Sequence, residues 1–186
     1  MGKIHVIKDI GDMAGLCLIE PVVYGDAQGD LMEAFHEEDL VKSGLNPKFV
    51  QDNQVFSYKG VLRGLHINRN HPQRKLIRAV VGSIYDVVVD LRKESNTFKQ
   101  WLGIMLSEDN HKQLYVPEGF AHGYLVLSQN AKVEYKVSEH YIPGDEIGIA
   151  WNSAELSIKW PKLEGMEYNM SYNDANNKPF SESDFY

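Results

Sequence analysis

From about residue 49 to residue 142 the sequence is a succession of short β-strand patterns, and this succession limits the fold more than any other feature. Turn signals such as Gly60, Gly82 and Gly119 separate the segments. The predicted strands are 49–58, 60–68, 75–81, 83–91, 99–106, 113–116, 121–127 and 133–138. Short strands at this spacing, with few helical patterns between them, are typical of an antiparallel sandwich or barrel. We therefore predict an all-β fold of the jelly-roll type.

The two ends of the chain differ from this central region. Strand patterns at 15–23 and 31–35 flank a predicted tight turn at 24–29, and 36–42 has the pattern of a short helix that ends at Ser43 and Gly44. After Pro143 the sequence is irregular and becomes polar. No repeat or low-complexity tract divides the chain. We predict one domain, 1–186, with an N-terminal strand arm (about 1–48), a barrel (about 49–142) and a C-terminal cover (about 143–186).

The segment 84–91 predicts how one strand of the barrel is oriented. Alternate side chains of a strand point to opposite faces. One face is then wholly apolar, with Tyr85, Val87, Val89 and Leu91, and the other is mixed, with Ile84, Asp86, Val88 and Asp90. This pattern predicts a strand with one solvent-facing side. Ser107 is placed to cap a single helical turn over the following acidic residues.

Composition restricts the partners and the compartment. The formal net charge is −7, from 19 Lys and Arg against 26 Asp and Glu, which argues against nonspecific binding of nucleic acid. A small anionic ligand held by a few local cations remains compatible with this charge. No apolar run approaches the roughly 18 residues of a membrane span, so we predict no membrane partner. A single cysteine, Cys17, cannot form an internal disulfide and indicates a reducing, cytoplasmic compartment.

The histidines raise the question of a metal site. His122 follows the turn that begins at Pro117, and His66 ends an earlier strand, an arrangement similar to metal-binding cupin barrels. The usual ligand pattern of those barrels, His-x-His followed by Glu, is missing, because Asn68 stands two residues after His66. We therefore predict no metal. The same concave barrel can support acid–base chemistry by His, Lys, Tyr and carboxylates instead. Each candidate also has a structural interpretation, as a core residue or as a strand-edge charge.

Motifs along nearly the whole chain resemble the dTDP-4-dehydrorhamnose 3,5-epimerase family, whose fold is a cupin jelly roll. Gln51-Asp52-Asn53 is followed at 60–66 by Gly-Val-Leu-Arg-Gly-Leu-His. Residues 74–78 read Arg-Lys-Leu-Ile-Arg, and residues 86–92 read Asp-Val-Val-Val-Asp-Leu-Arg. The most specific block is 117–128, Pro-Glu-Gly-Phe-Ala-His-Gly-Tyr-Leu-Val-Leu-Ser. The matches continue in order at 134–136, 148–152 and 158–161.

The resemblance implies the role of each site residue. His66 would be the general base, oriented by Asp174, while Tyr135 would be the opposing proton donor and Lys75 would lie near the 4-keto oxygen of the sugar. The nucleotide diphosphate would be held by Arg63, Gln51, Asn53 and His122. Glu33 and Glu146 match substrate-contact positions, and Tyr141 resembles an aromatic residue that lines the site. The resemblance also implies a homodimer in which the segment around Glu33 reaches the partner's site.

These residue types suit the implied reaction, which inverts C3 and C5 of dTDP-4-dehydro-6-deoxy-D-glucose to give dTDP-4-dehydro-L-rhamnose. Both hydrogens are α to the 4-keto group, so each inversion needs a base, an acid on the opposite face, and a donor or cation at the keto oxygen. A His–Asp pair, a neutral Tyr and a Lys supply these functions. The resemblance therefore implies that no cofactor is required.

Two positions depart from the family pattern and leave alternatives open. Gln28 stands where an Arg is usual, and Asn173 stands where a Lys is common, so two cations that would contact the nucleotide are missing. One alternative is a single-centre epimerase or a ketoisomerase that acts on a related nucleotide sugar. A noncatalytic sugar- or nucleotide-binding module and a metal-dependent cupin are two further alternatives.

Overall fold

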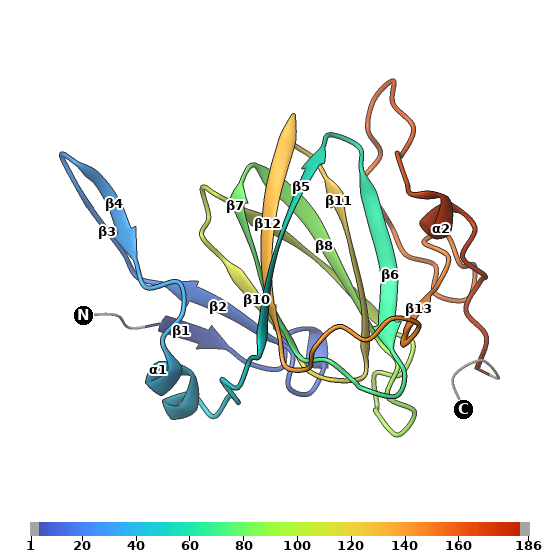
Figure 1. Ribbon diagram of the computed structural model, residues 1–186, viewed down its shortest axis with the longest axis horizontal. Coiled ribbons are helices and arrows are strands. Elements are labelled where there is room, and N and C mark those ends of the chain that lie inside the picture. The colour runs from blue at the N-terminus through green and yellow to red at the C-terminus, as the bar shows by residue number, and fades with distance from the viewer. Residues whose placement is uncertain (1–3, 183–186) are drawn as a thin grey trace.

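The chain folds into two antiparallel β-sheets that pack face to face; the computed structural model describes residues 4–182 (Figure 1). In spatial order the six-stranded sheet contains β1 (Ile4–Ile7), β2 (Cys17–Pro21), β10 (Gln113–Val116), β7 (Lys75–Val81), β12 (Asn130–Val137) and β5 (Gln51–Tyr58). The five-stranded sheet contains β13 (Glu146–Gly148), β6 (Leu62–Asn68), β11 (Phe120–Val126), β8 (Ser83–Asp90) and β9 (Trp101–Ser107). Most consecutive strands from β5 to β12 alternate between the two sheets. This is a jelly roll, as predicted.

Most of the predicted strands are present with small shifts at their ends. The predictions for 75–81 and 113–116 match β7 and β10 at both ends. The predicted helix at 36–42 is α1 (Glu37–Lys42), in which the His36 side chain accepts a hydrogen bond from the Asp39 N–H and so caps the first turn. At Ser107 the expected cap also forms, because Ser107 Oγ accepts a hydrogen bond from the backbone N–H of Asn110. The sequence patterns gave no sign of β1, β13, the short 3-10 helix η1 (Ile10–Asp12) or α2 (Tyr172–Ala175).

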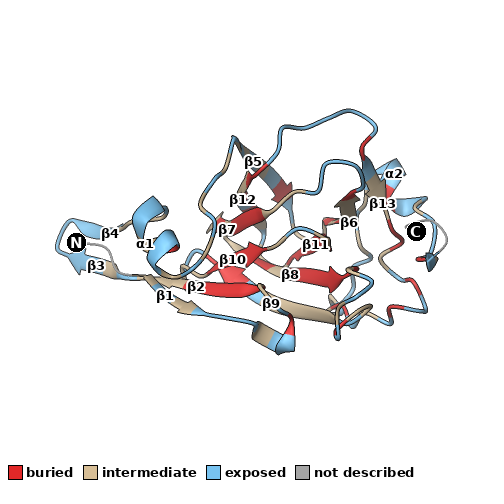
Figure 2. Cartoon of the chain, turned by 90° about the horizontal axis from the view of Figure 1, so that it is seen from below, coloured by how far each residue is buried: buried red, intermediate tan, exposed pale blue. Residues whose placement is uncertain are grey.

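The N-terminal segment divides into a part that joins the first sheet and a part that does not. Strand β2 pairs with β10, and β1 pairs with β2, so both extend the six-stranded sheet. The hairpin of β3 (Val23–Asp26) and β4 (Gly29–Met32) forms a separate two-stranded sheet that projects away from the barrel (Figure 1). Its turn is centred on Ala27 and Gln28, and most of its residues are exposed (Figure 2).

Three groups of buried apolar side chains hold the layers together. The first fills the space between the sheets and includes Ile77, Val88 and Leu114. The second lies on the outer face of the five-stranded sheet, where residues of the C-terminal segment such as Trp160 pack against β6, β8 and β11. The third packs α1 and the residues that follow it on the outer face of the other sheet. No helix among the described residues is both long and apolar enough to cross a membrane.

The prediction that one side of the 84–91 segment faces solvent is wrong, because both faces of this strand are covered. The apolar face, with Val87 and Val89, lies on the outside of the barrel and is buried by the C-terminal segment. The mixed face points into the barrel, where Ile84 and Val88 join the central core and Asp86 is fully buried. Period-2 alternation separates two faces of a strand but does not say which one is inside when both are covered.

Candidate active site

A cavity of about 260 Å³ opens between the two sheets and collects most of the predicted site residues. It is lined by Val55, Arg63, His66, Lys75, His122, Gly123, Tyr124, Tyr135, Tyr141 and Glu146. Strands β6, β11 and β13 contribute from the five-stranded sheet, and β5, β7 and β12 contribute from the six-stranded sheet. A ligand in this cavity would therefore have protein groups of different chemistry on its two sides.

A bulge in β6 brings Arg63 and His66 to the same face. A regular strand would place residues three apart on opposite faces. The pairing with β11 changes register here, because His66 is opposite His122 whereas Arg63 is opposite Tyr124. The extra residue lies around Gly64, which has φ +106°. A Cβ at Gly64 would lie 2.7 Å from the Cα of Gly123, so a larger residue does not fit without a shift of the neighbouring strand.

His66 and Asp174 form a short hydrogen bond at the edge of the cavity. The distance from His66 Nε2 to Asp174 Oδ1 is 2.7 Å, and the Asp174 side chain is only 6% exposed. Helix α2 positions the carboxylate, because Ser171 Oγ accepts from the Asp174 N–H and donates to Asp174 Oδ2. Burial acts to raise the pKa of Asp174, but the hydrogen bonds from His66, Ser171 and the Gly64 backbone hold the pKa below its ordinary value. An ionised Asp174 accepts a hydrogen bond from Nε2 and so orients the imidazole, and Nδ1 is the ring nitrogen that is not bonded to it.

Tyr135 and Lys75 come from the sheet opposite His66. Burial raises the pKa of Tyr135, Glu146 adds to this effect and Arg63 opposes it, so the phenol stays protonated at neutral pH. The Lys75 side chain is almost completely buried, and no hydrogen bond or ion pair joins its Nζ to another residue within 4–182. Burial lowers the pKa of Lys75, while the charges of Glu146 and Asp86 act to raise it. When this amine is protonated, its charge lies in a site with little water to compete for it.

His122 and Glu146 lie on the same sheet as His66. His122 Nε2 is 2.8 Å from Oδ2 of Asp86, which is fully buried on β8. Glu146 begins β13, and its Oε1 lies 3.8 Å from His66 Nδ1. Tyr141 comes from the loop before β13 and is largely exposed at the edge of the cavity.

The predicted residues Gln51 and Asn53 lie on β5, and Glu33 lies elsewhere. Gln51 Nε2 donates a hydrogen bond to Asn53 Oδ1, and the Tyr141 N–H donates to Gln51 Oε1. Both side chains share the face of β5 that carries Val55, and so continue the cavity wall. Glu33 follows the β3–β4 hairpin and does not line the cavity of its own chain. Its Oε2 is buried and has no hydrogen-bond partner in the described part of the chain.

Val55, Tyr124 and Asp86 are at the site or support it but are not among the residues predicted from the sequence. Tyr124 belongs to the 117–128 block and alternates with His122, so the period-2 rule could have placed both on the inner face. Asp86 lies on the mixed face of its strand, and a buried carboxylate needs a partner, which here is His122. Within residues 4–182 no group of three or more His, Cys, Asp and Glu side chains is arranged to hold a metal ion.

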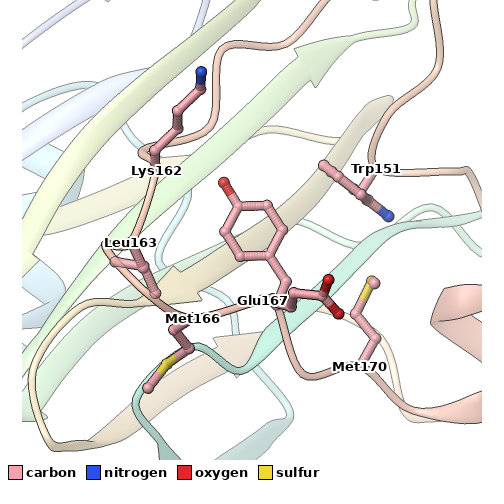
Figure 3. Close-up of a pocket in the computed structure, with 7 residues that line it drawn as sticks. Trp151, Lys162, Leu163, Met166, Glu167 and Met170 are labelled. Atoms are coloured by element: carbon pink, nitrogen blue, oxygen red, sulfur yellow. The ribbon is translucent and has the colours of Figure 1, made fainter.

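A larger hollow of about 490 Å³ lies in the C-terminal segment, and none of its lining residues lines the cavity between the sheets. Figure 3 shows its lining side chains. It is lined by Trp151, Lys162, Leu163, Met166, Glu167, Tyr168 and Met170. Trp151 and Tyr168 pack edge to face, with ring centroids 5.1 Å apart. This hollow has no histidine and no paired acid and base, so the cavity between the sheets is the better candidate for catalysis.

Comparisons with known proteins identify relatives of the whole chain. The family model for dTDP-4-dehydrorhamnose 3,5-epimerase matches residues 11–182. An enzyme of that name from Methanothermobacter thermautotrophicus is 45% identical over 186 residues, which covers 100% of both chains. The crystal structure of the Bacillus anthracis enzyme with TDP and PPi bound has a TM-score of 0.89 and 42% identity, covering 95% of this chain and 99% of that one.

A second solved structure is that of the Legionella pneumophila dTDP-6-deoxy-D-glucose-3,5-epimerase in complex with dTDP-4-keto-L-rhamnose. It has a TM-score of 0.88 and 40% identity, with 95% of this chain and 92% of that chain covered. Both the full-length identity and the matching fold confirm the resemblance found in the sequence. The chain belongs to the dTDP-4-dehydrorhamnose 3,5-epimerase family.

Proposed function

We propose that the protein is an isomerase that inverts C3 and C5 of dTDP-4-dehydro-6-deoxy-D-glucose to form dTDP-4-dehydro-L-rhamnose, in the biosynthesis of dTDP-rhamnose. Family membership supports this proposal. The observation that carries it is the placement of His66 and Tyr135 on opposite sheets around one cavity. A base on one side and a neutral acid on the other are what inversion at a carbon centre requires.

The reaction follows from the positions of these groups. His66 removes the proton from C3 or C5 with Nδ1, since Nε2 is bonded to Asp174, and becomes an imidazolium that the carboxylate stabilises. The electron pair moves onto the 4-keto oxygen, and the Lys75 ammonium stabilises the resulting enolate. Tyr135 donates its hydroxyl proton to the opposite face of the same carbon. Proton exchange with solvent then restores neutral His66 and neutral Tyr135.

The diphosphate of the substrate needs positive charge, which this acidic chain supplies locally. Arg63 lines the cavity and forms no ion pair with any residue that the structure describes. His122 lies on the neighbouring strand, and we assign both residues to the diphosphate. Gln51 and Asn53 extend the same wall with amide groups suited to hydrogen bonds with the nucleotide. Tyr141 and Glu146 complete the proposed substrate contacts at the edge of the cavity.

We further propose that two copies of the chain form a homodimer in which each hairpin arm reaches the partner's cavity. Among the described strands, β3 and β4 pair with each other alone, and their hairpin exposes Leu31 (58%). Edge strand β5 exposes Phe56 and Tyr58, whose rings pack against each other. An exposed edge with apolar side chains is a common place for a second copy to bind. Glu33, which lies outside its own chain's cavity, would then contact substrate in the partner.

The parts of the chain form a single functional domain in this proposal, because the cover supplies Asp174 and Glu146 to the barrel. The buried, unpaired thiol of Cys17 fits a reducing, cytoplasmic compartment. The proposed partner is the nucleotide-diphosphate sugar, and neither nucleic acid nor a membrane is required.

The test is proton NMR in deuterium oxide with dTDP-4-keto-6-deoxyglucose as substrate. We expect the C3 and C5 proton signals to disappear through exchange, together with new signals of the L-rhamno product. Exchange and inversion at one centre only would identify a single-centre epimerase instead. A carbonyl that moves along the sugar would identify a ketoisomerase, and the absence of any exchange would overturn the proposed function.

A further inference from the structure

Two buried hydroxyl groups lie behind Arg63 on the inner face of the barrel. Ser57 is on β5 and Tyr124 is on β11, and each is only 4% exposed. Arg63, on β6, is opposite Tyr124 in the strand pairing. Neither hydroxyl takes part in the proposed proton transfers. Polar groups in such a position are costly to bury, so their contacts indicate what they do.

Ser57 fixes one edge of the Arg63 guanidinium. Arg63 Nε donates a hydrogen bond to Ser57 Oγ at 3.1 Å. The two terminal Nη groups have no hydrogen-bond partner within residues 4–182. Because the guanidinium is planar and rigid, holding Nε also sets the direction in which the Nη edge points. That edge can bind two phosphoryl oxygens at once, and Arg63 lines the cavity in which the substrate is proposed to bind.

Tyr124 carries the second buried hydroxyl, and its residue is paired with Arg63 across the two strands. Its hydroxyl oxygen is buried and has no hydrogen bond of normal geometry to any described residue. Arg63 and Ser57 act to lower the pKa of this hydroxyl. Burial raises the pKa of Tyr124 to about 12, so its hydroxyl stays protonated and acts as a donor or acceptor but never as a base at physiological pH. An orphaned hydroxyl in a core is not explained by stability, because Phe would fill the same volume without the cost.

We propose that Ser57 and Tyr124 are positioning residues that hold the guanidinium of Arg63 toward the phosphoryl oxygens of the substrate. Ser57 acts directly through Nε, and Tyr124 acts by completing the hydrogen bonding of Ser57 when the anion draws Arg63 into place. The inference deepens the proposed function and rests on it, since it takes the ligand to be a nucleotide diphosphate.

The test measures binding of dTDP by isothermal titration calorimetry, which does not depend on turnover. We expect Ser57→Ala to weaken binding about tenfold, as for loss of one hydrogen bond to a charged group. Tyr124→Phe should weaken it by a smaller factor, about threefold, without lowering the melting temperature. Ser57→Thr keeps the hydroxyl and should restore binding. In steady-state assays KM should rise while kcat changes little, because the contact is lost from substrate and transition state alike.

A double-mutant cycle separates positioning from a structural effect. In an Arg63→Lys background there is no Nε to hold, so adding Ser57→Ala or Tyr124→Phe should cause no further loss of affinity. Equal losses in both backgrounds would overturn the inference, as would a variant that loses melting temperature but binds dTDP like the wild type. Unchanged binding in Arg63→Lys and Ser57→Ala would overturn it as well. If the cycle behaves as expected but the wild type exchanges no substrate proton, the proposed function fails and the anion site stands.

Discussion

Replacement of Asp174 by Asn tests whether the carboxylate sets the protonation state of His66. The change keeps the size of the side chain, which matters because Asp174 is buried and both of its oxygens are hydrogen-bonded. An amide has one acceptor oxygen and one NH2 donor in place of two acceptors. Ser171 can still donate to the amide oxygen, which turns the NH2 group toward His66 Nε2. The imidazole would then carry its proton on Nδ1, the nitrogen that should act as the base.

The size of the effect follows from what the carboxylate contributes. Loss of a charge-assisted hydrogen bond of 2.7 Å to the developing imidazolium is worth roughly 1.5–3 kcal/mol, or about 10- to 150-fold in rate. The wrong tautomer adds to this loss, and in a His–Asp pair of a serine protease the same substitution lowers kcat by about 10⁴-fold. We therefore expect kcat of Asp174→Asn to fall by about 10²- to 10⁴-fold.

The assay is the rate of deuterium incorporation at C3 and C5, followed by NMR under saturating substrate. Asp174 does not line the cavity, so dTDP affinity by calorimetry should stay within about twofold of wild type, and this serves as the control for folding. A variant that folds, binds dTDP and exchanges both protons within about threefold of the wild-type rate would refute the reasoning. Such a result would mean that His66 does not depend on Asp174 for its tautomer.

The pH dependence of stability provides an independent check. The folded-state pKa of Asp174 lies below its ordinary value of 3.8, so the ionised group stabilises the fold fully above that pH. This contribution is lost as the pH falls through the lowered pKa. The melting temperature of the wild type should therefore approach that of Asp174→Asn in acid, and a constant difference down to the acid limit would contradict the pKa direction.

The remaining predictions concern the donor, the enolate cation, the shared site and the fold. Tyr135→Phe should allow some exchange of substrate protons but suppress inversion, and normal epimerisation by this variant would exclude Tyr135 as the donor. Because burial lowers the pKa of Lys75, activity should be lost at a pH below the one at which an ordinary lysine loses its proton. Lys75→Arg should remove this loss of activity at alkaline pH, even if its overall rate is lower. If the arm crosses to the partner, each mixed dimer of a His66→Ala subunit and a Glu33→Ala subunit contains one site with both wild-type residues. An equal mixture of the two variants should then regain about a quarter of the wild-type sites. No recovery of activity after subunit exchange would argue against the shared site. Hydrogen bonds from Arg92, Ser95 and Thr97 outweigh the effect of burial and lower the pKa of Asp90 to about 2. The free energy of unfolding should therefore fall by about 2 kcal/mol as the pH falls from about 4 toward 2. Urea titrations should show this loss in the wild type and not in Asp90→Asn.

The barrel strands could be predicted from the sequence because turn residues and strand patterns are local signals. The shared face of Arg63 and His66 could not be derived in this way. Simple alternation separates these two residues, and only the bulge at Gly64 unites them. The contact between His66 and Asp174 joins residues 108 positions apart, and no local pattern encodes it. For these two features the family resemblance, and not periodicity, supplied the expectation.

One physical cause explains why no side of the 84–91 segment faces solvent and why Asp174 lies beside His66. The C-terminal segment, which the sequence predicts to be a cover, has little regular structure. Its apolar residues Leu156, Trp160 and Phe180 bury the outer face of the five-stranded sheet. Backbone hydrogen bonds at 2.8 and 2.9 Å then join Asn169 to the start of β6, a few residues before His66. An irregular segment held by both kinds of contact has little freedom left. Burial of the apolar face of β8 therefore also fixes α2 behind His66, which ties the stability of the cover to the geometry of the catalytic pair.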